Sequence, residues 1–261
     1  MEIALKILSR LFPSRCILCQ RTVYPDTDDA GSKMSGVEIC PTCLSMLPFN
    51  HPCCVSCALP LAEDIGDDNL CGRCIQKLPA FDYSYSLFRY EADLIRLIHQ
   101  LKFSEKISHA RSIGILLLEK LRTEVSCQEN LPDCLLPVPL HSRRMRQRGF
   151  NQSIEIARVI ATGLQIPIIS DAVIRHRSTQ SQTGLSARQR KKNIRGAFDV
   201  LGNVVGDPAS NLASNLAGKH VLIIDDVVTT GSTVNELAKL LKKHKVEKVG
   251  VLSIARAPIR S

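Results

Sequence analysis

Residues 221–233 read VLIIDDVVTTGST and organise the rest of the chain. Four apolar residues lead into Asp225 and Asp226, and a turn rich in hydroxyl groups follows around Gly231. The apolar run predicts a strand that is buried on both faces of a parallel sheet. The helix-like run NELAKLLKKH comes next, so the turn would aim backbone N–H groups and a helix N-terminus at one point, as phosphate-binding turns do. The paired carboxylates suit a ribose diol or Mg²⁺.

This stretch resembles the thirteen-residue phosphoribosyl-pyrophosphate (PRPP) motif of type I phosphoribosyltransferases at every position. That motif has apolar residues, two acids, a short spacer and T-[TA]-G-[ST]-T. A Walker loop is excluded because no Gly-Lys-Ser/Thr follows the strand, and a dinucleotide fingerprint is excluded because the turn holds one glycine. The alternative is a strand that ends in a solvated acidic turn, which accounts poorly for two adjacent acids and a complete phosphate-turn composition.

The chain from residue 79 onward alternates between strand-like and helix-like patterns. The expected elements are strands 83–90, 135–139, 170–175, 219–226 and 249–254, and helices 94–101, 107–121, 153–163 and 234–244. From residue 135 onward this order predicts a doubly wound parallel sheet. Its ligand crevice would lie at the carboxyl ends of the strands.

A second basic segment, LHSRRMRQRGFNQS, follows the expected strand 135–139. We expect a short basic loop that carries four arginines and Gly149 and leads into a helix, which is a second place to hold an anion. The alternative is an arginine-rich loop that is merely solvated. In a phosphoribosyltransferase this loop would lie at the pyrophosphate of PRPP. The arginines are Arg143, Arg144, Arg146 and Arg148.

The polar stretch 175–198 reads RHRSTQSQTGLSARQRKKNIRGAF and cannot bury itself. We expect a mobile loop that orders over an anion, with a disordered linker as the alternative. A contact for a nucleic-acid backbone is also consistent with the clustered charge. Only Phe150 and Phe198 flank the basic segments, which argues against a dedicated reader of single strands. The candidate lid residues are Gln182, Arg188, Lys191, Lys192 and Asn193.

Nine of the eleven cysteines lie between residues 16 and 74, and eight of them form four C-x-x-C pairs. Such a pair lets both thiolates reach one ion, and two pairs complete a tetrahedral site of four sulfurs that favours zinc. Disulfides would need an oxidising compartment, and a redox motif accounts for a single pair. We therefore expect two structural zinc ions. The ligands would be Cys16, Cys19, Cys40, Cys43, Cys54, Cys57, Cys71 and Cys74.

The spacing leaves the assignment of these pairs to ions open. In-order pairing needs the shorter loops and is preferred, while a cross-braced arrangement would combine the first and third pairs. Cys53 could replace Cys54 only at a three-residue spacing to Cys57. A site of four thiolates has no open position for water, so we expect structure and not catalysis from the metal. We place an N-terminal zinc-ribbon region at residues 1–78 and a phosphoribosyltransferase-like domain at residues 79–261.

The 261-residue chain carries a net charge of +9, which suits nucleic acid, PRPP or an acidic membrane surface. Ordinary solubility charge is the alternative. Its apolar runs are far shorter than the roughly 20 residues of a membrane span, and the N-terminus is a poor signal peptide. We expect a cytoplasmic protein without membrane insertion.

The motifs occur in a distinctive order. Cysteine pairs come first, then F-R-Y and H-Q-L-K-F, then P-V-P-L with R-G-F-N-Q, then Q-x-G-L-S-x-x-x-R with K-N-I-R-G-A-F, and the PRPP motif last. In this order the chain resembles the ComF family, competence-associated phosphoribosyltransferase-like proteins, over nearly its whole length. It departs from the family pattern at Ala58 and in a longer connector at 202–218.

The resemblance implies an α/β chain with a type I phosphoribosyltransferase fold, which is a doubly wound parallel sheet with a hood. It also implies an N-terminal double zinc ribbon with four cysteines for each ion. It also implies a role in natural transformation or in the use of imported DNA. Asp225 and Asp226 would take the ribose hydroxyls directly or through Mg²⁺, and Arg148 and Gly149 would face the pyrophosphate. The remaining PRPP-binding residues would be Val227, Val228, Thr229, Thr230, Gly231, Ser232 and Thr233, the last five around the 5′-phosphate.

No residue stands out as a general base for a nucleobase, which leaves three hypotheses. The first is an enzyme that transfers phosphoribose to an acceptor and releases pyrophosphate. The second is an adaptor that binds PRPP and single-stranded DNA without turnover. The third is a zinc-ribbon scaffold that binds another competence protein.

Overall fold

A computed structural model describes residues 14–23, 36–63, 69–103, 107–124, 131–177, 189, 193–201 and 216–258. In chain order the elements are β1 (Ser14–Arg15), β2 (Thr22–Val23), α2 (Pro41–Ser45), α3 (Gly72–Gln76), β3 (Tyr83–Arg89), α4 (Ala92–Phe103), α5 (Ile107–Glu124), β4 (Cys134–Pro137), α6 (Ser142–Arg148), α7 (Gln152–Leu164), β5 (Val173–Arg175), β6 (Phe198–Val200), β7 (His220–Val228), α10 (Ser232–Lys243) and β8 (Lys248–Arg256). Among these residues, no helix is both long enough and apolar enough to cross a membrane.

Four parallel strands form the central sheet in the order β3-β8-β7-β4. The two central strands, β7 and β8, are apolar along almost their whole length and are buried on both faces, as inner strands of a parallel sheet must be. Val221 pairs with Cys134 on one side and with Val249 on the other. The predicted parallel sheet is confirmed, and its carboxyl edge carries the two acids of β7.

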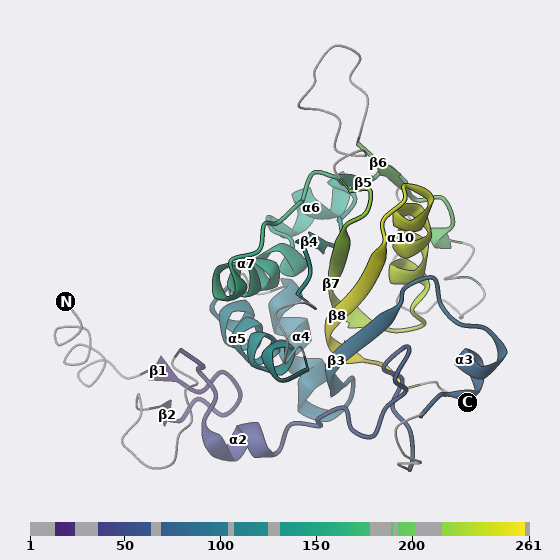
Figure 1. Ribbon diagram of the computed structural model, residues 1–261. Helices are drawn as coiled ribbons and strands as arrows, with labels where there is room; N and C mark the ends of the chain where they lie inside the picture. Colours follow the sequence, from purple (N-terminus) through teal and green to yellow (C-terminus); the bar gives the residue numbers. More distant parts are fainter. Residues whose placement is uncertain are drawn as a thin grey trace.

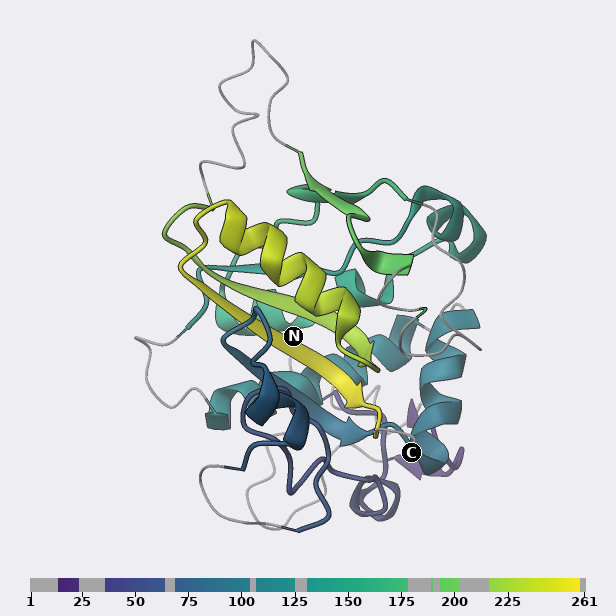
Figure 2. The same cartoon turned by 90° about the vertical axis from the view of Figure 1, so that its right-hand side faces the viewer.

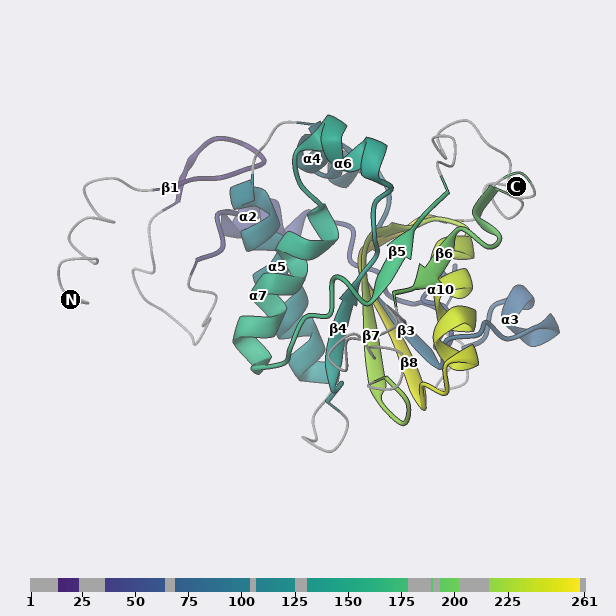
Figure 3. The same cartoon turned by 90° about the horizontal axis from the view of Figure 1, so that it is seen from above.

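One predicted strand of the sheet is wrong. Within 170–175 only β5 is a strand, and it pairs antiparallel with β6 in a separate two-stranded sheet. Arg175 pairs with Phe198 in this register. Each strand has only three residues, so its ladder is too short to show a periodicity in the sequence. Figure 3 shows the β5–β6 pair between α6 and α10 in the view from above.

Helices cover both faces of the sheet. Figure 1 shows α4, α5 and α7 on one side and α10 on the other, and Figure 2 shows α10 running along β7 and β8. Because successive side chains of a strand point to opposite faces, Leu222 and Ile224 pack in the core beneath α5 and α7. Val221 and Ile223 pack in the second core, beneath α10. These two layers complete the predicted doubly wound arrangement.

The two cysteine-rich segments lie on different sides of β3 (Figure 1). The first packs with α4 and α5 through Cys16, Ile17 and Ile39, and Glu38 N donates to Ser112 Oγ of α5 at 3.0 Å. The second segment leads to Ala80, whose N–H donates to Asn235 Oδ1 of α10 at 2.8 Å. Each segment is therefore fastened to its own face of the domain.

Gly250 makes the sheet sensitive to one methyl group. It pairs with Tyr83 across β3 and β8, and a Cβ at this position would lie 2.3 Å from Cζ of Tyr83. The Tyr83 hydroxyl is held by His220 Nε2 at 2.8 Å, so the ring cannot move without losing that bond. We expect Gly250→Ala to lower the free energy of unfolding in urea by about 1–3 kcal/mol, the usual cost of overpacking.

The control for this prediction is the same substitution in a Tyr83→Ala background. Without the ring the added methyl group meets no close neighbour from that side chain, and most of its cost should disappear. An equal loss of stability with and without Tyr83 would contradict the packing explanation.

Candidate functional site

The candidate site is built on the carboxyl end of β7. Asp225 is buried and Asp226 is half-buried. Asp226 N donates to Asp225 Oδ1 at 2.9 Å, and Val227 N donates to Asp226 Oδ1 at 2.7 Å. Each carboxylate is thus held by the backbone N–H of the next residue. Carboxylate oxygens held in this way suit hydroxyl groups or a hard cation.

The hydroxyl turn, residues 229–231, joins β7 to α10. Gly231 has a φ of +76° and forms the N-cap of α10 without a side-chain capping bond, and this left-handed conformation favours glycine. Thr230 Oγ1 accepts from Ser232 N at 3.3 Å and lies 2.8 Å from Ser232 Oγ. Hydroxyl groups and the N-terminal N–H groups of a twelve-residue helix therefore face the same place, which suits an anion.

The predicted basic loop at 140–149 is wrong, because this segment forms helix α6. The His141 ring caps its first turn by accepting from Arg143 N at 3.2 Å, and Gly149 ends it in the left-handed conformation. Arginine, glutamine and methionine are good helix formers, so the short helix needs no apolar periodicity. Arg148 Nη1 donates to Gln152 Oε1 of α7 at 3.2 Å.

Arginines from two elements act on the two acids electrostatically. Burial lowers the pKa of Arg144, the charge of Arg148 lowers it further, and Asp226 opposes both effects. Burial also lowers the pKa of Arg175, to about 10, together with the charge of Arg144 and against the attraction of Asp225. Positive charge from α6 and β5 therefore interacts with the carboxylates in a partly desolvated site, where it is effective on anions.

Arg175 is the site residue that sequence reasoning missed. It is buried and lies over the ring of Phe198, with Cζ 5.6 Å from the ring centroid. A basic residue at the end of a short apolar run was visible in the sequence. Its position in the fold is set by the antiparallel pairing of β5 with β6, in which it lies opposite Phe198, and no spacing in the sequence shows that pairing.

Most of the expected lid lies outside the described residues. Gln182, Arg188, Lys191 and Lys192 are in this part, while Asn193 is described and is half-buried next to the buried Ile194. The lid stays a prediction.

The cysteines form two groups, as in-order pairing predicts. The first cysteine group is Cys16, Cys19, Cys40 and Cys43, and the second cysteine group is Cys54, Cys57, Cys71 and Cys74. All four Sγ atoms of each group lie within 4.8 Å of one another, with 3.8 Å between those of Cys19 and Cys40 and 3.7 Å between those of Cys57 and Cys71. Tetrahedral zinc with Zn–S bonds of about 2.3 Å has S···S edges of about 3.8 Å. Both groups fit zinc, and the second uses Cys54 in place of Cys53.

Backbone donors favour one thiolate in each group. Cys71 N donates to Cys54 Sγ at 3.3 Å, and Cys40 N donates to Cys16 Sγ at 3.4 Å. Burial raises the pKa of Cys54, but backbone hydrogen bonds outweigh it and bring the value to about 7. Burial and a hydrogen bond with Cys71 raise the pKa of Cys74 to about 11, and the charge of Cys54 adds to this effect. A divalent cation would relieve this repulsion, as expected where a metal completes the site.

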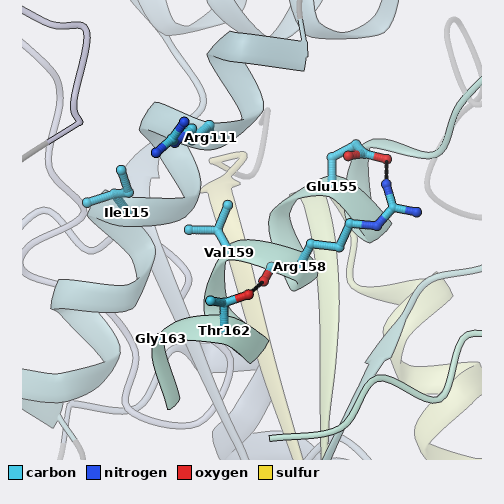
Figure 4. A pocket seen from close by; sticks show the side chains of 7 residues that line it. All are labelled: Arg111, Ile115, Glu155, Arg158, Val159, Thr162 and Gly163. Atoms are coloured by element: carbon cyan, nitrogen blue, oxygen red, sulfur yellow. Dashed lines mark hydrogen bonds and ion pairs between the residues drawn. The ribbon is translucent and has the colours of Figure 1, made fainter. Parts of the chain in front are cut away.

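A cavity of about 440 Å³ lies between α5 and α7, and its lining includes no residue of the β7 site or of the cysteine groups. Figure 4 shows its lining, including an ion pair of 2.5 Å between Arg158 Nη1 and Glu155 Oε1. The face of α7 toward the sheet carries Ile156 and Ile160, so the cavity lies on another face of this helix.

Comparison with known proteins agrees with this architecture. Residues 151–260 match the phosphoribosyl transferase domain family, and residues 7–75 match the double zinc ribbon domain family. DNA utilization protein YhgH of Escherichia coli K12 is 37% identical over 219 residues, which are 84% of this chain and 90% of that protein. Competence protein F of Haemophilus influenzae is 30% identical over 96% of this chain and 100% of that protein. The chain belongs to the ComF family.

The ComF chain therefore combines a type I phosphoribosyltransferase domain with an N-terminal double zinc ribbon. Among solved structures, purine phosphoribosyltransferase from Pyrococcus horikoshii aligns with a TM-score of 0.32 and 18% identity, over 56% of this chain and 82% of that chain. The acids of β7 and the hydroxyl turn lie within the matched domain, and α6 comes directly before it.

Proposed function

We propose that this ComF protein binds PRPP with Mg²⁺ at the carboxyl end of β7 and serves in the uptake or use of imported DNA. The observation that carries the proposal is the fixed pair of carboxylates next to the hydroxyl turn, faced by arginines of α6 and β5. The names of the relatives, a DNA utilization protein and a competence protein, support the cellular role.

Each part of PRPP would have a partner in the proposed complex. Asp225 and Asp226 would bind the ribose hydroxyls, directly or through Mg²⁺, and the hydroxyl turn with Ser232 and Thr233 would hold the 5′-phosphate. Arg148, Arg144 and Arg175 would face the pyrophosphate. The Mg²⁺ ion would neutralise charge on the pyrophosphate.

The two cysteine groups are proposed to hold one structural zinc each. Their S···S distances and the backbone N–H bonds to Cys16 and Cys54 suit a closed tetrahedral site. Bound zinc would supply folding energy to a segment with little apolar material of its own.

Transfer of phosphoribose would break the bond between ribose C1 and the pyrophosphate oxygen and form a bond from C1 to an acceptor. The arginines would stabilise the charge that develops on the departing pyrophosphate, while the carboxylates face the cationic ribose. These arginines and carboxylates would contact PRPP, which is the donor of phosphoribose. They therefore support PRPP binding and do not identify the acceptor.

Calorimetry of the zinc-loaded full chain with PRPP tests this proposal. We expect binding of one PRPP per chain that depends on Mg²⁺, with weaker binding of ribose 5-phosphate and of pyrophosphate alone. Absence of heat at millimolar PRPP with Mg²⁺ would overturn the proposal. Incubation of labelled PRPP with a panel of nucleobases then separates a transferase, which releases pyrophosphate steadily, from an adaptor, which binds without release.

Binding of single-stranded DNA is a second candidate function, favoured by the exposed arginines of α6. Arg143 and Arg146 are exposed, whereas Arg144 and Arg148 are half-buried. We expect Arg143→Ala/Arg146→Ala to weaken DNA binding. The slope of the logarithm of the binding constant against the logarithm of the salt concentration should become less steep by about 2, or about 1 for each phosphate that is no longer neutralised. PRPP affinity should stay within about twofold, because neither side chain is placed at the site.

Fluorescence anisotropy with a labelled oligonucleotide over a salt series provides this measurement. Arg122→Ala is the control, since Arg122 lies on α5 and donates to Gly163 O and to Glu119. A salt response that is flat in the wild type would contradict backbone contacts altogether.

A further inference from the structure

Arg256 connects the candidate PRPP site with the second cysteine group. It is the last residue of β8 and is only 3% exposed. Its Nη1 donates to Val228 O at 3.1 Å, to Thr229 O and to Ala257 O at 3.1 Å. Its Nε donates to Cys57 O at 3.0 Å. One buried guanidinium therefore holds the start of the hydroxyl turn and a member of the second cysteine group.

The chemistry of arginine makes this connection rigid. A buried charge is costly unless its donors are bonded, and the carbonyl oxygens of the turn and of Cys57 supply that bonding. The guanidinium is planar, so the directions of Nε–H and Nη1–H are fixed relative to each other. A shift of the Cys57 carbonyl must therefore either break a bond or reposition Arg256 against Val228 and Thr229.

The second cysteine group is joined to the PRPP side of the domain by other contacts as well. Cys57 and Ala80 pack against the core beneath α10, and Ala80 N donates to Asn235 in the first turns of α10. The segment that carries the first cysteine group makes its contacts elsewhere: Glu38 N donates to Ser112 Oγ of α5, and Leu18 O accepts from Arg96 of α4.

We propose that Arg256 is a positioning residue through which the second cysteine group controls the geometry of the hydroxyl turn, so that metal in the second group, and not in the first, sets the affinity for PRPP. This inference rests on the proposed function, in which the hydroxyl turn binds PRPP. Coupling between two ligands is reciprocal. PRPP must therefore raise the affinity of the second group for zinc, and we expect this to be observed as slower loss of zinc from that group.

The wild-type chain provides the first test. Zinc transfer to a coloured chelator is followed with and without PRPP and Mg²⁺, and two kinetic phases are expected. They are assigned with Cys19→Ser, which disrupts the first group, and with Cys57→Ser, which disrupts the second. We expect PRPP to slow the phase of the second group about tenfold, within the usual range of allosteric coupling, and to leave the other phase unchanged.

Substitution of Arg256 provides the second test. Arg256→Lys keeps the charge but replaces the planar fork by a single ammonium group, which cannot reach Cys57 O and the turn together. The matched control is Arg89→Lys. Arg89 pairs with Arg256 in the sheet register and donates to His51 O at 2.7 Å, so it holds the zinc-ribbon segment through a bond that does not involve the hydroxyl turn.

With both zinc ions retained, we expect the Kd for PRPP to rise about tenfold in Arg256→Lys and by less than about twofold in Arg89→Lys. Cys19→Ser should raise the Kd for PRPP less than Cys57→Ser does, although each variant loses one zinc ion.

The outcomes separate the two proposals. A wild type that binds no PRPP overturns both. The coupling alone is overturned if the wild type binds PRPP but PRPP leaves both zinc phases unaffected or slows them equally, and the two lysine variants bind PRPP with equal affinity. The PRPP site then remains in place. If Arg256→Lys does not fold, selective slowing of one zinc phase in the wild type still decides the question.

Discussion

Magnesium-dependent PRPP binding should be lost when Asp225 and Asp226 are both replaced by asparagine. Asparagine keeps an oxygen that can accept from Asp226 N and Val227 N, so the bonds that shape the end of β7 persist. It removes both negative charges that would bind Mg²⁺ or the ribose hydroxyls. Since each hydrogen bond to a charged group contributes about 1.5–3 kcal/mol, the loss of two predicts at least about a 100-fold rise in Kd.

The measurement is calorimetry with PRPP in the presence and absence of Mg²⁺, beside thermal unfolding to verify the fold. Asp199→Asn is the matched control, because Asp199 is an exposed acid of β6 that pairs with His176 Nε2 at 3.4 Å. Retention of Mg²⁺-dependent binding within about threefold in the double variant would contradict the assigned roles.

Loss of zinc should have the largest effect on stability. Structural zinc contributes about 10–16 kcal/mol to the folding of zinc-finger peptides at pH 7. Among the residues that the structure describes, the apolar cluster of the second cysteine group is small and includes the buried Leu59. We expect Cys54→Ser to lose one of two zinc ions and the amide protection of the described residues around 53–76. Cys53→Ser, its immediate neighbour, should keep both ions and wild-type protection.

Metal analysis and hydrogen exchange provide these measurements. Protons compete with metal for thiolates, so zinc affinity falls as pH falls. Transfer to a chelator should be faster at about pH 6 than at about pH 8. Equal zinc loss in Cys53→Ser and Cys54→Ser would show that the second group is assembled differently.

Features encoded locally were predictable from sequence. The apolar run of β7 with its two acids, the alternation around it and the C-x-x-C spacing each reflect interactions within a few residues or one loop length. Features that depend on pairing across the chain were not. Arg175 lies opposite Phe198 in the β5–β6 register, and Arg256 lies next to the hydroxyl turn because it pairs with Val228 in the sheet.

Helix α6 shows a different limit. Its sequence has a single apolar residue, Met145, so hydrophobic periodicity could not reveal it. Of its two termini only the C-terminus carries a usual signal, Gly149 as C-cap, because His141, the N-cap, is not among the preferred N-cap residues. Arginines expected on a loop are therefore displayed at helical spacing, which directs Arg144 and Arg148 inward and leaves Arg143 and Arg146 exposed.

The strand order β3-β8-β7-β4 has a consequence for biosynthesis. β3 leaves the ribosome early, yet the strand that it pairs with in the sheet is β8. A nascent chain that has not reached residue 256 holds completed cysteine groups but an exposed edge on β3, and such edges invite wrong pairing. Arg256 belongs to the same strand, so the sheet and the contact of Arg256 with the hydroxyl turn are completed together, after β8 has left the ribosome.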